Sequence, residues 1–269
     1  MINNHNFSSQ RGATLIVVMM ILLILTFVGV LAIRVAMSSL NISTHTQVGQ
    51  FLSQTADTPI NQVYTGNLST LVDLSGVIGY ALQDSKLEPG NEYNFCFKPM
   101  SNEKFGSTLG VAVKRPPVSN TAKASGLASG GSDGFCDLDK DFGSSREAVI
   151  TQVAVTIPTD AIVDLKPGAL LSRGTNLSLG TIMPRNVVEQ QRVRVTTTSI
   201  VPSFSHDLSA AQNCIGTGSG SVGYISDDTG GDTRGFETIA KCLAKLGVPV
   251  NSQTQEFNLQ TIFNQTKDP

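Results

Sequence analysis

The chain has 269 residues, only 15% of them charged, and a formal net charge of -2. Because basic and acidic residues are interspersed, the sequence offers no broad positive surface for nucleic acid, and we expect no direct nucleic-acid binding. Once a strongly apolar N-terminal segment is set aside, the length suits one folded head of about 200 residues. That head is rich in Ser, Thr, Gly and Asn.

The N-terminal segment from Ala13 to Ile33 contains no ionisable side chain. As a helix rising about 1.5 Å per residue it covers a hydrocarbon core of roughly 30 Å, which predicts a transmembrane helix over residues 13–34. A secretory signal has a shorter apolar core of about 7 to 15 residues. An ordinary signal anchor has the same length and composition, so that alternative stays open. Arg11 and Arg34 flank the segment on both sides, so its charges orient it only weakly.

The residues around the start of this segment resemble a known processing signal. Gln10-Arg11-Gly12, followed by Ala13 and an apolar run, resembles the class III signal that prepilin peptidase cuts after the glycine. The stretch RGATLIVVMMILLILTFVGVLAIRVAMSSL resembles the N-terminus of the PilX group of minor pilins, which is related to the K minor pseudopilins of type II secretion. The resemblance covers about the first 45 residues. It implies a leader over residues 1–12 and a mature chain that begins at Ala13.

Val17 departs from the family pattern. Most pilins carry a glutamate as the fifth residue after the cleavage point, where it is thought to pair with the N-terminal amine of a neighbouring subunit. An unpaired charge in a bilayer costs several kcal/mol, so that pair helps a new subunit to dock. A subunit with Val17 lacks the carboxylate, as is proposed for subunits that initiate a filament. A non-pilin anchor would also explain the valine.

The resemblance implies a structural protein without enzymatic activity. We expect a minor pilin of the tip or priming complex that promotes type IV pilus assembly and so supports twitching motility, cell adhesion or DNA uptake. The implied partners are other minor pilins, the major pilin, prepilin peptidase, inner-membrane lipid and a tip adhesin. The implied location is the inner membrane before assembly, then the pilus tip in the periplasm and at the cell surface. A tip minor pseudopilin of type II secretion and a single-pass anchored binding or hydrolase domain are the alternatives.

Residues 35–65 are predicted to continue the helix as an amphipathic outer half that packs on the head. Its apolar stripe comprises Leu40, Val48, Phe51, Leu52, Ala56, Ile60 and Val63. The run SSLNISTHTQ, Asp57-Thr58-Pro59 and Gly66 predict a bend or a frayed turn.

Residues 66–269 are predicted to form a disulfide-containing head. Aromatic and β-branched residues predict strands at 93–98, 109–114, 149–157 and 193–201. A helix is predicted at Gly235–Leu246, with Asp232 or Thr233 as its N-cap. The Ser/Gly-rich pieces at 118–134 and 216–235 are expected to be exposed loops. The expected fold class is α+β and pilin-like, with the long N-terminal helix packed on an antiparallel sheet and an additional C-terminal helix.

Four cysteines lie beyond the apolar segment, as expected for a head that folds in an oxidising compartment. They are Cys96, Cys136, Cys214 and Cys242, and they allow three connectivities. We favour Cys96 with Cys136 and Cys214 with Cys242, because each pair closes a moderate loop, for which a bridge contributes about 2 to 4 kcal/mol.

The head carries few residues that suggest chemistry. Gly130–Gly134 matches G-x-S-x-G but stands in a Ser/Gly-rich piece without the strand and helix of a nucleophile elbow. Alternate carboxylates at Asp137, Asp139 and Asp141, with Glu147 beyond them, are the ligand type that calcium prefers. The EF-hand pattern fails because Phe142 replaces its glycine, and a solvated acidic turn is the favoured reading. Some K-type pseudopilins that the chain resembles bind calcium, so calcium is the one cofactor considered and otherwise we expect none.

Overall fold

A computed structural model of the chain describes residues 13–99, 105–119, 125–144, 146–160, 189–217, 221–230 and 233–261. The predicted leader, including Arg11 and Gly12, lies outside the described residues. The chain forms two compact units, the first ending at Val48 and the second beginning at Gly49. Each is described by itself below.

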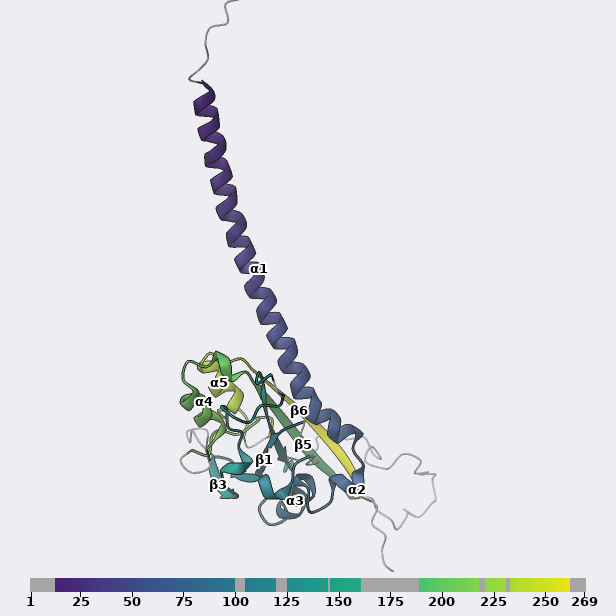
Figure 1. The fold of residues 1–269 in the computed structure, drawn as a ribbon. Helices are drawn as coiled ribbons and strands as arrows, with labels where there is room; N and C mark the ends of the chain where they lie inside the picture. Colours follow the sequence, from purple (N-terminus) through teal and green to yellow (C-terminus); the bar gives the residue numbers. More distant parts are fainter. Residues whose placement is uncertain are drawn as a thin grey trace, which may run out of the picture. The chain divides into compact units, whose positions relative to one another are not determined.

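Helix α1 runs without a break from Ala13 to Thr65 (Figure 1). The prediction of a frayed turn in the SSLNISTHTQ run is wrong, because the helical hydrogen bonding continues through it. The hydroxyls of Thr44 and Thr46 donate to the carbonyl oxygens four residues earlier at 2.9 Å, so these side chains are satisfied within the helix. Pro59 also lies inside the helix, where its ring is buried. The helix ends directly before Gly66, as the sequence indicated.

The last turns of α1 belong to the second unit and enter its core. Leu52, Ala56 and Val63 are buried, in agreement with the predicted amphipathic face. Leu40 and Phe51 are exposed, so the packed stripe is shorter and narrower than predicted. Leu40 belongs to the first unit, whereas Phe51 lies on the part of α1 in the second unit but is 41% exposed.

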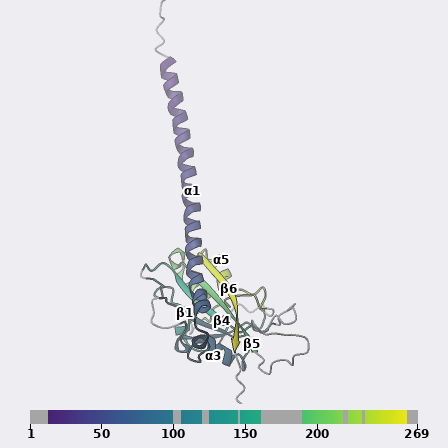
Figure 2. The same ribbon diagram turned by 90° about the vertical axis from the view of Figure 1, so that its right-hand side faces the viewer.

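The head contains a six-stranded antiparallel sheet in the order β3-β2-β1-β4-β5-β6. Its strands are β1 Glu92–Phe97, β2 Ala112–Arg115, β3 Gly126–Ser129, β4 Ile150–Thr156, β5 Glu189–Ile200 and β6 Val250–Thr261. Figure 2 labels its strands β1, β4, β5 and β6. The predicted strand at 109–114 begins late, because Thr108–Gly110 forms a 3-10 turn capped by the Ser107 hydroxyl. Strands β3 and β6 were not predicted. The chain is therefore an α+β protein, as expected.

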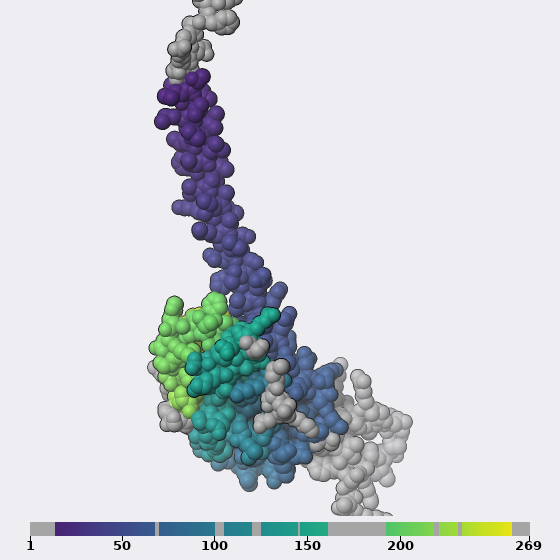
Figure 3. Space-filling view, viewed as in Figure 1, coloured from purple at the N-terminus to yellow at the C-terminus, as the bar shows by residue number. Residues whose placement is uncertain are grey.

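Each face of the sheet packs on its own core. One core joins α1 and α3 (Val77–Asp84), close to the short helix α2 (Leu68–Leu71), to the side chains of Tyr93, Phe95 and their neighbours. The other joins the opposite face to α4 (Leu208–Ile215) and α5 (Ile239–Lys245), with Ile150 and Ile200 at its centre. Two short 3-10 helices, Ser132–Gly134 and Pro202–Phe204, complete the head. In Figure 3 the green atoms around α4 lie against the teal atoms of residues 126–144.

Three predictions for the head need correction. Helix α5 begins at Ile239, four residues after the predicted start, because Gly235 has a positive φ and Thr238 is the N-cap. The piece at 118–134 contains strand β3 and is not only loop. In the piece at 216–235, Ile225 and Ser226 are buried against the sheet.

Candidate functional site

Residues 15–33 of the first unit present an uncharged apolar surface. Every large apolar side chain from Leu15 to Ile33 is 51–68% exposed. Among the described residues, α1 is the one helix long and apolar enough to cross a membrane, by length and composition. The Thr26 hydroxyl donates to the Leu23 carbonyl at 2.7 Å, so it needs no water. Val17 lies on this surface and Ala13 is the first helical residue, where the peptidase resemblance would start the mature chain.

Polar contacts hold the last turns of α1 on the sheet. The Thr197 hydroxyl of β5 donates to the carbonyl oxygen of Ala56 at 2.8 Å, and both residues are buried. The Gln253 amide of β6 donates to the Ser53 hydroxyl at 3.0 Å and to the Ser53 carbonyl at 3.3 Å. These bonds fix the rotation of the last turns of α1 and their position along the strands. Apolar contacts alone define both less sharply.

Both disulfides join the pairs that the loop lengths favour. Cys96 on β1 is bonded to Cys136, and Cys214 on α4 is bonded to Cys242 on α5. The first ties the 126–144 region to the sheet. The second links α4 to α5, the two helices that cover the face of the sheet opposite α1. Sequence reasoning missed α4, although Asp207 caps its N-terminus and the spacing of Ala211, Cys214 and Ile215 is helical.

Sequence reasoning also missed a buried polar cluster on the face of the sheet opposite α1. The carboxylate of Glu92 accepts hydrogen bonds from the Ser226 N–H at 2.9 and 3.1 Å, and the Lys114 ammonium donates to the Tyr224 carbonyl at 2.7 Å. Burial raises the pKa of Glu92 to about 7 and lowers the pKa of Lys114 to about 8. Glu92 and Lys114 are cross-strand partners in β1 and β2. The cluster anchors residues 224–226 to the sheet.

The acidic turn that was considered for calcium forms a self-contained hydrogen-bond network. Asp137 accepts from the Asp139 N–H and Asp141 accepts from the Asp137 N–H, both at 2.9 Å. Lys140 pairs with Asp137 at 3.1 Å, and the Asp139 N–H bond, above all, lowers the pKa of Asp137. Within the described ranges, no three His, Cys, Asp or Glu residues are arranged to hold a metal ion. Glu147 is exposed with a positive φ, and calcium binding stays the less favoured alternative to a solvated acidic turn.

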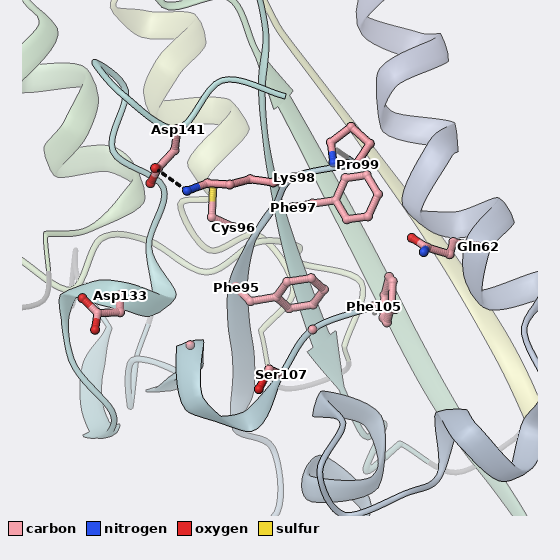
Figure 4. Close-up of a pocket in the computed structure, with 12 residues that line it drawn as sticks. Gln62, Phe95, Cys96, Phe97, Lys98, Pro99, Phe105, Ser107, Asp133 and Asp141 are labelled. Atoms are coloured by element: carbon pink, nitrogen blue, oxygen red, sulfur yellow. Dashed lines mark ion pairs between the residues drawn. The ribbon is translucent and has the colours of Figure 1, made fainter. Parts of the chain in front are cut away.

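A small cavity of about 170 Å³ lies beside this turn (Figure 4). Lys98 pairs with Asp141 at 2.7 Å across one end of it. Phe95 and Phe105 meet edge to face, with ring centroids 5.1 Å apart, at the other. The ion pair is partly exposed, and the aromatic pair belongs to the core that contains α1 and α3. The cavity is therefore a gap between packed elements.

The G-x-S-x-G match does not form a nucleophile elbow. Ser132 begins a 3-10 turn, is exposed, and its hydroxyl donates to the adjacent Asp133 carboxylate at 3.3 Å. An elbow requires a strand that leads into an α-helix at the serine. This segment therefore offers no activated nucleophile.

Comparison with known proteins adds no relative. No protein-family profile, no curated protein and no solved structure matches this chain.

Proposed function

We propose that the protein is a minor pilin of the PilX group, a subunit of the tip or priming complex from which a type IV pilus is assembled. The observation that carries this proposal is α1, one helix of 53 residues that is apolar and exposed at its start and buried in the head at its end. A simple membrane anchor needs only about 20 apolar residues, and its helix need not continue into the head. A filament subunit needs a longer helix, because one part of it packs against other subunits while the last turns belong to the head.

The same helix would serve two environments in turn. In the inner membrane its exposed apolar side chains contact lipid, after prepilin peptidase has removed the leader. In the filament they contact the corresponding helices of other minor pilins and of the major pilin, which are equally apolar. Because lipid and helix surfaces are alike in polarity, the exchange depends on packing and on the few polar pairs within the bilayer. A complex at the pilus tip could in addition hold an adhesin or contribute to DNA uptake and twitching motility.

Processing of the N-terminus tests the proposal most directly. Mass spectrometry of the protein from native membranes and from sheared surface fibres should find a mature chain that begins at Ala13, N-methylated, and it should find the leader retained in a strain without prepilin peptidase. Met1 in the fibre-associated protein, or a cut on the outer side of the membrane, would instead identify an ordinary anchor. Presence in sheared pili also distinguishes a pilin from a pseudopilin of type II secretion, whose loss would block protein secretion.

The assembly position is tested by placing a carboxylate on α1. Val17→Glu restores the residue that most pilins carry, and Val18→Glu is the matched control because both valines are 54% exposed. Deleting the protein should reduce the number of surface pili. Val17→Glu should move the subunit from the tip into the shaft, whereas Val18→Glu should only weaken incorporation, as measured by immunogold labelling. Unchanged pili in both the deletion and Val17→Glu would refute an initiating role.

A further inference from the structure

The two edges of the sheet differ in how they are protected. Strand β3, at one edge, has four residues, and its pairing with β2 shifts register between Val113 and Lys114. Short edge strands and register irregularities are common ways to prevent unwanted strand pairing. Strand β6, at the other edge, has 12 residues and pairs with β5 along its whole length without a register shift. It contains no Pro, Lys or Arg.

Among the described residues, the outer edge of β6 has no backbone partner. Within the part of the chain that the structure describes, β6 pairs only with β5. In an antiparallel pair, alternate residues direct their N–H and C=O groups away from the partner, so about six residues of β6 point these groups outward. Its one charged residue, Glu256, accepts a hydrogen bond from Arg194 through its carboxylate, so this charge is not free to prevent strand pairing at the edge.

An apolar groove lies directly beside this edge. It has a volume of about 670 Å³ and runs between the end of α1 and residues 255–259 of β6. Val63 and Leu259 form its buried floor, Ile60 and Phe257 are half-buried in its walls, and Tyr64 is 78% exposed at its rim. An added strand would therefore find backbone partners on β6 and a place for every second side chain in the groove.

We propose that this edge binds an extended segment of another protein by strand addition, with apolar side chains at alternate positions of the segment. A row of outward N–H and C=O groups at strand spacing is matched by another extended backbone. Five residues of β6 border the groove, so the bound segment spans about 16 Å and inserts two or three apolar side chains. No charge is needed on the segment, since the Glu256 carboxylate is already paired.

A second copy of the chain fits the site less well. On the groove side, β6 is tied to its own α1 by the bonds from Gln253 to Ser53. A β6 strand from a second copy would bring its own helix to the same face of the sheet, where the two helices would compete for the groove. A segment that carries no helix avoids this conflict. The inference is independent of the proposed function, because it depends only on the second unit.

A synthetic probe can test strand addition on the full chain in detergent micelles. The probe is an amidated peptide of about seven residues that alternates threonine with leucine, long enough to cover the groove, with a fluorophore on its N-terminal amine. Two further versions carry N-methyl groups on the amides of one edge or of the other. Fluorescence anisotropy should show saturable binding of the parent peptide, loss of binding with one methylated edge, and unchanged binding with the other. Equal effects of the two methylated versions, or no saturable binding, would overturn the proposal.

Variants of α1 supply the matched control. Tyr64→Ala removes the exposed ring at the rim and should weaken peptide binding about tenfold. Phe51→Ala removes an exposed ring from the same helix outside the groove and should leave binding unchanged. Equal affinities of the two variants would place the peptide elsewhere. A chain that ignores the peptide and dimerises in micelles would assign the edge to a second copy and so contradict the proposal.

Discussion

Removing the Cys214–Cys242 bridge gives a quantitative test of what holds the α4–α5 pair on the sheet. The two cysteines are separated by 28 residues. For a loop of that length the chain-entropy relation predicts a loss of about 3.6 kcal/mol on cleavage. The unit that contains the bridge extends from Gly49 to Pro269, a size at which 1 kcal/mol shifts the melting temperature by about 2 to 4 °C. A fall of about 7 to 14 °C follows.

The assay is thermal unfolding of the full chain in detergent, followed by circular dichroism. Replacing both Cys214 and Cys242 with alanine avoids leaving buried hydroxyls without partners. The corresponding double variant of Cys96 and Cys136, whose separation is 40 residues, should lose a similar amount, about 3.9 kcal/mol. A variant melting temperature within a degree or two of the oxidised parent, measured without reductant, would refute the reasoning for that bridge.

Three further changes test packing and charge in the head. Between pH 5 and 7.5 the parent should lose stability on the order of 2 kcal/mol, because the folded Glu92 carboxyl, with its pKa raised to about 7, holds a proton that the unfolded chain releases above about 4.5. Glu92→Gln should abolish this loss. Equal pH slopes in urea unfolding for parent and variant would contradict this. Ala56→Leu should destabilise the head by about 1 to 3 kcal/mol because Ala56 is fully buried under β5, whereas Gln54→Leu on the exposed side should change little. Gly223→Ala should lower the melting temperature more than Gly247→Ala: both have φ near +74°, but only at Gly223 would the new Cβ meet a backbone oxygen, that of Ile215 at 2.3 Å.

Elements dominated by local pattern agree well with the sequence prediction. The apolar run of residues 13–33 predicted the first half of α1, because a helix satisfies its backbone hydrogen bonds within one segment. Period-two alternation places the predicted strands at 149–157 and 193–201 close to β4 and β5. The cysteine spacings favoured the pairing that is present. The residues that suggest processing, Gly12 and Ala13, were identified by resemblance.

Tertiary structure determined those features for which the local sequence pattern is weak or ambiguous. Strand β6 is rich in Gln, Asn and Thr, so it gives little hydrophobic alternation, and it is a strand because β5 offers a complete row of backbone partners. Glu92 and Lys114 would be assigned to the surface by their chemistry, yet they are buried because residues 224–226 supply a hydroxyl, an amide and a carbonyl at bonding distance. The length of the packed stripe on α1 was likewise set by the height at which the sheet meets the helix. Sequence period identifies the elements, but only the assembled head determines which of their polar groups find partners.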